Sequence, residues 1–277
     1  MKNLIILISL AAIFSSCEKT VDLDLRQSES KIVIEGQVTN HPGYQYVRVT
    51  RTAGFYDDGA TPRVTNANVS VKDDLGNEFL FNHNPGGSAD STGYYLPDVA
   101  FEGEIGRTYT LTVEVDGEIY TAQDKLFSVS GIDSLSYRIN PDEQEDPKDD
   151  NKFYEVLLYA KEPQDEENYY LFKFFRNDSL KVYNLTDIYF ADDKVLGEAI
   201  DGLGSPVYFA PNDKARIEMY SISRAGYIYY VDLQNLLNND GGLFSQPPSN
   251  SRTNLSNGAY GFFQASEVDV KTILIEE

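Results

Sequence analysis

The chain has 277 residues and a formal net charge of −21, because 44 Asp and Glu outnumber 23 Lys and Arg. A surface this acidic repels nucleic acid and anionic lipid headgroups, so we expect no nucleic-acid partner. The single cysteine excludes an intramolecular disulfide. The 20 Tyr and 15 Phe, with no Trp, are typical of a β-rich protein.

The first 17 residues have the pattern of an exported lipoprotein. A charged start is followed by an apolar run from Leu4 to Phe14, two serines and Cys17. This order is typical of a secretory signal, and the run is too short for a membrane-spanning helix. We therefore expect residues 1–16 to be a signal peptide and Cys17 to carry the lipid that anchors the mature chain. Ordinary secretion with an incidental cysteine is the alternative.

Residues 17–30 are polar and predict a lipidated tether. After the tether, short segments with alternating apolar residues are separated by turn sequences, which predicts strands. The expected strands are 31–39, 44–52, 67–72, 78–81, 93–96, 108–115 and 118–122. Many short strands without a helical pattern predict an immunoglobulin-like β-sandwich over residues 31–130.

Residues 131–277 predict a second β-rich domain. Its expected strands are 132–139, 153–160, 168–176, 187–196, 207–209, 215–221, 259–263 and 267–275. Both faces of the strand around Tyr169–Phe175 are largely apolar, so it is buried on both sides or one side faces a partner. The acidic segment 141–151 has the composition of a linker. We interpret it as a solvent loop inside the second domain, because strand 132–139 precedes it.

One helix is expected, over residues 223–238. Ser223 is a suitable N-cap, and Asp240-Gly241-Gly242 stops the helix. Gly226 lowers helix stability by about 1 kcal/mol relative to Ala, and a close approach of the helix to a sheet would explain it.

The residue types present do not form a catalytic pattern. The chain has only two histidines, His41 and His83, each in a turn or loop, and the Gly-x-Ser-x-Gly nucleophile motif is missing. We therefore predict a non-enzymatic protein without catalytic residues or a cofactor. Four aspartate pairs offer oxygen atoms to calcium but lack the spacing of a calcium loop, so we expect turns rather than metal sites. The pairs are Asp57-Asp58, Asp73-Asp74, Asp149-Asp150 and Asp192-Asp193.

Several stretches together carry a family resemblance. They are Cys17 with Val21–Leu25, then Lys31–Gly36, Gly106–Val113, Ile132–Leu135, Ser221–Ser223, Pro247–Asn250 and Leu255–Phe263. In this order they resemble the Bacteroidota lipoproteins grouped as domain of unknown function 4249. The resemblance implies an outer-membrane, surface-exposed lipoprotein whose gene neighbours often encode TonB-dependent receptors. The resemblance identifies no catalytic residues in this chain.

Three short motifs are similar to the sites that Bacteroidota O-glycosylate on exported proteins. They place a serine between an aspartate and a threonine or leucine, which makes Ser91, Ser134 and Ser179 candidate O-glycosylation sites.

We therefore expect a lipoprotein held in outer-membrane lipid through acylated Cys17 and exposed on the cell surface. It would act as a non-enzymatic accessory or ligand-capture partner of a TonB-dependent receptor. Ala53–Thr65 and Asn82–Gly93 are the expected binding loops, because polar loops on a β scaffold tend to carry function. The alternative is a structural subunit of a larger outer-membrane assembly that binds no ligand, with edge strands as its contact surfaces.

Overall fold

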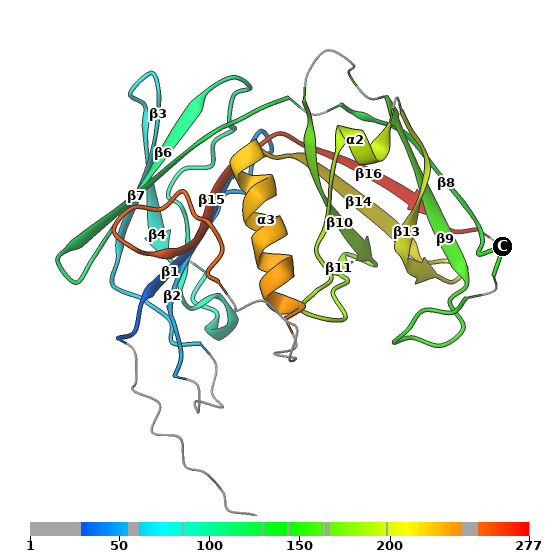
Figure 1. Ribbon diagram of the computed structural model, residues 1–277, viewed down its shortest axis with the longest axis horizontal. Helices are drawn as coiled ribbons and strands as arrows, with labels where there is room; N and C mark the ends of the chain where they lie inside the picture. Colours follow the sequence, from blue (N-terminus) through cyan, green and yellow to red (C-terminus); the bar gives the residue numbers. More distant parts are fainter. Residues whose placement is uncertain are drawn as a thin grey trace, which may run out of the picture.

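The computed structural model describes residues 29–54, 61–84, 86–128, 130–142, 144–161, 163, 167–197, 199–239 and 249–276. The expected signal peptide, Cys17 and nearly all of the expected tether lie outside these residues. The described chain is mainly β and forms two bodies side by side, with helix α3 (Arg224–Leu237) between them (Figure 1). Within the described ranges, no helix combines the length and apolar character needed to cross a bilayer.

The first body is one eight-stranded sheet in the order β15-β1-β2-β5-β4-β3-β6-β7. Its strands are β1 (Ile32–Thr39), β2 (Tyr46–Arg51), β3 (Asn68–Asp73), β4 (Glu78–His83), β5 (Tyr94–Pro97), β6 (Thr108–Val115), β7 (Glu118–Lys125) and β15 (Tyr260–Ser266). A short 3-10 helix, η1 (Ala89–Ser91), lies between β4 and β5. Alternate residues of β6, such as Leu111 and Val113, are fully buried inside the curved sheet, as the period of two predicts.

The structure differs from the expected immunoglobulin-like sandwich, because one nearly closed, barrel-like sheet replaces two facing sheets. Its end strands, β7 and β15, are joined by an isolated bridge between Phe127 and Ser266. Between them, Asn254 Nδ2 donates to the carbonyl oxygens of Gln123 at 3.0 Å and Phe263 at 2.7 Å. Strand β15 pairs with β1 in parallel, although the two strands are far apart in the sequence. The pattern of neighbouring residues therefore contains no information on this pairing.

The second body contains two sheets. The three-stranded sheet has the order β13-β9-β8, and in the five-stranded sheet β10 pairs with β14, β11 and β12, and β14 pairs with β16. The strands are β8 (Ile132–Ile139), β9 (Tyr154–Lys161), β10 (Tyr169–Arg176), β11 (Ser179–Leu180), β12 (Tyr189–Asp192), β13 (Ala199–Phe209), β14 (Lys214–Ser221) and β16 (Val268–Leu274).

Strand β10 is buried on both faces, as its sequence predicts. Phe172 and Phe174 belong to the core between the two sheets of the second body, where they meet residues of β9 such as Leu158. On the opposite face, Leu171 belongs to a second cluster that includes Tyr227 of α3. Both faces of this aromatic strand are therefore covered within the chain itself.

The segment expected as a strand over 187–196 divides into β12 and a single-turn helix, α2 (Asp193–Leu196). The division follows from the side chain of Asp192, which accepts a hydrogen bond from the Val195 backbone N–H at 3.0 Å and so caps a helix.

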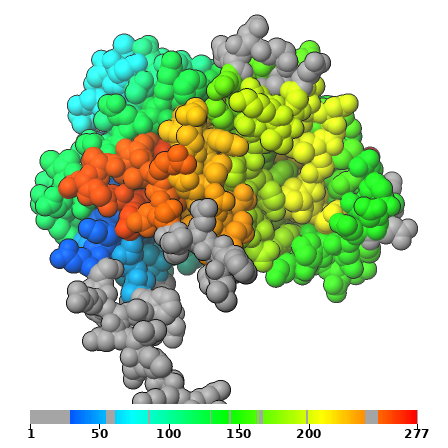
Figure 2. Space-filling view, in the orientation of Figure 1, coloured from blue at the N-terminus to red at the C-terminus, as the bar shows by residue number. Residues whose placement is uncertain are grey.

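Helix α3 occupies the region predicted over residues 223–238. The Ser223 hydroxyl accepts a hydrogen bond from the Gly226 N–H at 3.2 Å, which caps the first turn as predicted. Gly226 is buried, but a Cβ added there would lie 3.5 Å from Phe262 Cε1, an ordinary contact. The approach of the helix to the sheet therefore leaves room for a methyl group and does not require glycine. Figure 2 shows α3 exposed on one face between the two bodies.

Candidate functional site

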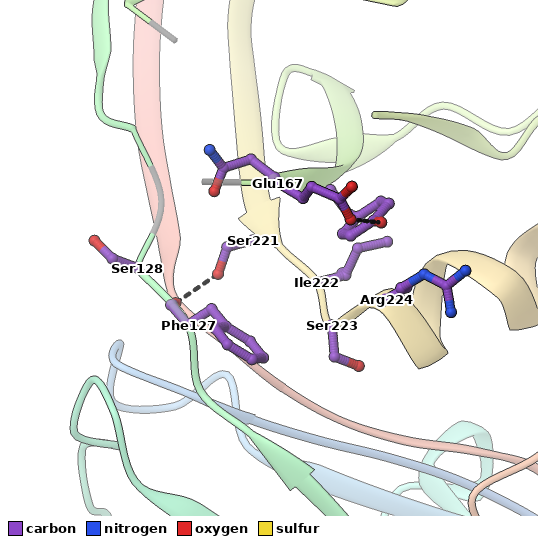
Figure 3. A pocket seen from close by; sticks show the side chains of 9 residues that line it. Phe127, Ser128, Glu167, Ser221, Ile222, Ser223 and Arg224 are labelled. Carbon is purple, nitrogen blue, oxygen red and sulfur yellow. Dashed lines mark hydrogen bonds between the residues drawn. The ribbon is translucent and has the colours of Figure 1, made fainter. Parts of the chain in front are cut away.

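A pocket of about 420 Å³ lies at the junction of the two bodies (Figure 3). Three segments form it: the exit from β7, the start of β10, and the turn from β14 into α3. Its lining residues are Phe127, Ser128, Glu167, Asn168, Tyr169, Ser221, Ile222, Ser223 and Arg224. We call this the junction pocket.

Hydrogen bonds between these segments hold the walls of the junction pocket together. The Ser221 hydroxyl donates to the Phe127 carbonyl oxygen at 2.6 Å, which ties β14 to the exit from β7 (Figure 3). The Ile222 N–H donates to the Tyr169 carbonyl oxygen at 2.8 Å, which ties the start of α3 to β10. The pocket is therefore built on strand ends rather than on free loops.

The polar side of the junction pocket centres on the Tyr169 hydroxyl, which donates to Glu167 Oε2 at 3.0 Å. Burial and this carboxylate raise the pKa of Tyr169, and the Arg224 guanidinium opposes the shift. Tyr169 therefore keeps its proton at neutral pH. The pocket offers a guanidinium and hydroxyl groups beside the apolar side chains of Phe127 and Ile222. This combination is suited to binding a polar ligand.

Asp124 lies buried beside the N-cap of α3. Its Oδ2 accepts a hydrogen bond from the Ala265 N–H at 2.9 Å, and the Ser223 hydroxyl is a second partner. Burial raises the pKa of Asp124 to about 6, although these hydrogen bonds oppose the shift. Asp124 was not predicted as a functional residue, because the expected strand ended at residue 122, whereas β7 continues to Lys125 and buries Asp124.

A network of charged and phenolic groups crosses the junction on the face of β14 that looks toward the first body. The buried Glu218 carboxylate accepts from the Tyr44 hydroxyl at 2.8 Å and from the Tyr220 hydroxyl at 2.6 Å, and it pairs with Arg216. Arg216 also donates to Tyr44 at 3.0 Å. Because Tyr44 belongs to the first body and the others to the second, this network fixes the relative position of the two.

The two histidines lie in the first body, away from the junction pocket. His41 is exposed in the turn between β1 and β2, where its ring packs against Tyr44. His83 is the last residue of β4 rather than a loop residue as expected, because the strand runs two residues beyond the predicted segment, and it accepts a hydrogen bond from the Gly93 N–H at 3.0 Å. Both side chains thus have local packing and turn contacts.

The described members of the aspartate pairs take part in local structure. Asp73 accepts from the backbone N–H groups of Leu75 and Asn77 at 2.9 and 2.8 Å, which closes the turn between β3 and β4. Despite the opposing effect of desolvation, these bonds hold the pKa of Asp73 below its usual value. Asp192 caps α2. Asp57-Asp58 lies outside the described residues, and those searched contain no group of three or more His, Cys, Asp or Glu placed to hold a metal.

The acidic segment 141–151 is anchored to the second body in a way that its composition does not indicate. The Asp146 carboxylate is buried and accepts from Arg176 at 3.0 Å and from the Tyr183 hydroxyl at 2.7 Å. Arg176 also pairs with Asp149. The one signal in the sequence is Arg176 itself, a cation at the end of the largely apolar strand β10.

The two expected binding loops meet beside β2. The Val49 N–H donates to the Gly93 carbonyl oxygen at 2.8 Å, and the Val64 N–H donates to the Val49 carbonyl oxygen at 3.1 Å. Residues 55–60 of the first loop lie outside the described chain. Strand β2 therefore brings both loops to one place, apart from the junction pocket.

The three candidate glycosylation sites lie on separate elements. Ser91 is half-buried at the end of η1, whereas Ser134 on β8 and Ser179 on β11 are exposed. Modification of these serines stays a prediction, and glycopeptide mass spectrometry that finds all three unmodified would contradict it. The expected lipid site, Cys17, lies outside the described residues.

Fold and site together define a two-body β protein with a polar pocket at the junction. The chain belongs to the family described as domain of unknown function (DUF4249), whose model matches residues 18–272. This confirms membership of that domain family over nearly all of the chain beyond the expected signal peptide, whereas the Bacteroidota lineage and the lipid anchor stay predictions. None of the curated proteins compared with the chain matches it.

Proposed function

We propose that this protein is an outer-membrane, surface-exposed lipoprotein of Bacteroidota type, anchored through Cys17, that acts as a non-enzymatic ligand-capture partner of a TonB-dependent receptor. The junction pocket would receive the ligand, and the two loops beside β2 would contact the receptor. The observation that carries the proposal is the position of those loops relative to the start of the described chain.

The first described residues lie at the same end of the molecule as the described parts of the two loops (Figure 1). The Ser30 hydroxyl donates to the Thr52 carbonyl oxygen, and the Lys31 N–H donates to the Thr52 hydroxyl, each at 3.0 Å. Thr52 directly precedes the loop Ala53–Thr65, and the second loop joins it at β2. A tether that ends at Ser30 would therefore place both loops on the membrane-facing end.

The length of the tether supports this arrangement. Residues 18–29 separate Cys17 from Ser30. An extended chain covers about 3.4 Å per residue, so the tether spans at most about 40 Å. An anchored molecule would hold the loops close enough to contact the outer surface of a membrane receptor.

A thiol cross-linking experiment tests the proposal. If the lipid occupies the Cys17 thiol, one introduced cysteine is the only free thiol. Ala89→Cys places it in the exposed loop Asn82–Gly93, and Thr272→Cys places a matched control at an exposed position of β16 in the second body. We expect the lipidated Ala89→Cys protein to cross-link to a TonB-dependent receptor in intact cells, and the Thr272→Cys protein to do so at least about tenfold less.

Two outcomes contradict the proposal. If neither position cross-links to a receptor, or both do so equally, the loops do not face a receptor. Recovery of an outer-membrane assembly machine by both variants would favour the structural-subunit alternative. Cys17→Ala is the anchoring control: we expect it to leave the membrane fraction, and continued membrane association would exclude the lipid anchor.

A further inference from the structure

A second, smaller cavity lies behind α3, between β1, β2 and β15 of the first body and β10 of the second. Its volume is about 150 Å³, and none of its lining residues belongs to the junction pocket. The walls come from Tyr229 and Tyr230 of α3 and Tyr46 of β2, and the polar groups include Lys173 of β10 and Gln264 of β15. We call this the helix-backed cavity.

Gln264 brings an unused hydrogen-bond donor to this cavity. The residue is only 4% exposed, and its Oε1 accepts from the Tyr230 hydroxyl at 3.0 Å. Its buried Nε2 has no hydrogen-bond partner within the described part of the chain. Buried amide donors in folded proteins are nearly always satisfied, so the free Nε2 of this lining residue is available to an acceptor that enters the cavity.

Lys173, whose side chain is partly buried, brings a positive charge to the same cavity. Its Nζ lies 4.4 Å from the centroid of the Tyr220 ring and 3.5 Å from Gln37 Oε1, and it forms no ion pair among the described residues. Burial lowers the pKa of Lys173, and the nearby Glu218 opposes this. Glu218 is the cross-strand neighbour of Lys173 on β14, but its oxygens are bonded to Tyr44, Tyr220 and Arg216.

The size and charge of the cavity limit its occupant. A cavity of about 150 Å³ accommodates a molecule the size of benzene, which has about six non-hydrogen atoms. The ammonium group of Lys173 can balance one negative charge on the ligand. Glu35, which also lines the cavity, pairs with Arg48 at 2.7 Å and would repel a more highly charged anion such as phosphate. Three tyrosine rings suit an apolar body.

We propose that the helix-backed cavity binds a small organic monocarboxylate, with the Lys173 ammonium and the Gln264 Nε2 donating to the carboxylate oxygens. Tyr46, Tyr229 and Tyr230 surround the apolar part of the ligand. This site is independent of the proposed receptor and of the lipid anchor, so either proposal can fail without the other.

Butyrate is a suitable probe, because it has six non-hydrogen atoms and one carboxylate. Titration of the purified full chain with sodium butyrate, followed by calorimetry or saturation-transfer NMR, gives its affinity. We expect saturable binding, with 1-butanol, the neutral analogue, at least about tenfold weaker. This comparison uses the unaltered protein and therefore does not depend on whether a variant folds.

Two variants locate the site. Lys173→Met removes the charge and keeps the length of the side chain, and Gln264→Glu replaces the donor but still accepts from Tyr230. We expect each to weaken butyrate binding at least about tenfold. Lys72→Met, at a lysine on β3 whose side chain is 51% exposed, is the matched control and should leave the affinity unchanged. Circular dichroism verifies that each variant is folded.

Three outcomes overturn the proposal. They are the lack of saturable butyrate binding, equal binding of butyrate and 1-butanol, and folded Lys173→Met and Gln264→Glu proteins that bind butyrate as well as the unaltered chain does.

Discussion

Arg176 and Asp146 show how two charged residues can be enclosed together as an ion pair. Arg176 is 3% exposed and Asp146 is 5% exposed, and the guanidinium also donates to the Tyr208 carbonyl oxygen at 2.6 Å. Although desolvation opposes it, the hydroxyl of Tyr183, nearby backbone N–H groups and Arg176 hold the pKa of Asp146 below its usual value. The carboxylate therefore stays ionised at neutral pH and holds the acidic segment on the second body.

Loss of one partner from this ion pair should lower the free energy of unfolding substantially. Asp146→Asn leaves the Arg176 charge buried and only partly matched, so we expect it to lower the free energy of unfolding by about 3–5 kcal/mol. Asp178→Asn is the control, since it removes an exposed partner of Lys214 and should cost about 1 kcal/mol or less. Denaturant unfolding at pH 7.5 measures both. Equal effects of the two substitutions would show that Asp146 acts as a surface group.

The raised pKa of Asp124 predicts that the free energy of unfolding changes with pH in the opposite direction to the change caused by Asp146. The folded pKa of about 6 exceeds the unfolded value of 3.8, so the folded state binds the proton more tightly. The free energy of unfolding should therefore fall as pH rises from about 4 to 6, by about 3 kcal/mol from this group. Asp124→Asn removes the contribution. Denaturant unfolding at several pH values gives the free energy of unfolding of both proteins. We expect the value of the unaltered chain minus that of the variant to fall as pH rises over this range. A rise would contradict the raised pKa of Asp124.

At the scale of elements, the backbone requires a glycine at one position in β15, whereas a glycine in α3 can be replaced. Gly261 of β15 has a φ of +100°, and a Cβ added there would overlap the carbonyl oxygen of Ile34 on β1. The parallel pairing of these two strands therefore depends on glycine. Gly226 of α3 has helical geometry and space for a methyl group.

Alanine substitutions separate these two roles. Gly261→Ala should lower the free energy of unfolding by more than about 3 kcal/mol, because strand β15 must move away from β1. Gly226→Ala should be neutral or stabilise the protein by up to about 1 kcal/mol, since it raises helix propensity without a clash. Thermal unfolding followed by circular dichroism compares the two. A tolerated Gly261→Ala would show that β1 and β15 pair differently.

Local signals in the sequence were sufficient for most elements. The Ser223 cap located α3, and the alternating residues of the segments 108–115 and 118–122 located β6 and β7. They were insufficient for the closure of the first sheet, because the partner of β1 comes from a remote segment. The same limit applies to the cavities. Lys173 is one of two cations in a largely apolar strand, and only the packed fold shows that Gln264 lines the same cavity.

At the scale of the whole molecule, the C-terminal strands join the two bodies. Strand β15 completes the first sheet and β16 the second, with only Glu267 between them. The junction network adds a second connection through Glu218 and Tyr44. Each body therefore contains a strand whose neighbour in the sequence belongs to the other body.

This connection predicts cooperative unfolding. We expect one calorimetric transition whose calorimetric and van't Hoff enthalpies agree, because neither body can lose its C-terminal strand without disturbing the other. A flexible Gly-Ser insertion after Glu267 should weaken the coupling and broaden or split the transition. Two separate transitions in the unaltered chain would show that the bodies are independent.

The parallel pairing of β1 with β15 also determines the order in which the first sheet is completed during synthesis. Val33 and Tyr260, which are partners in this pairing, are separated by most of the chain. Until Tyr260–Ser266 has been made, one edge of β1 has open N–H and C=O groups that any other extended chain can bind. Closing so long a loop is also slow. A nascent chain of this protein therefore needs protection from self-association until its last strands emerge.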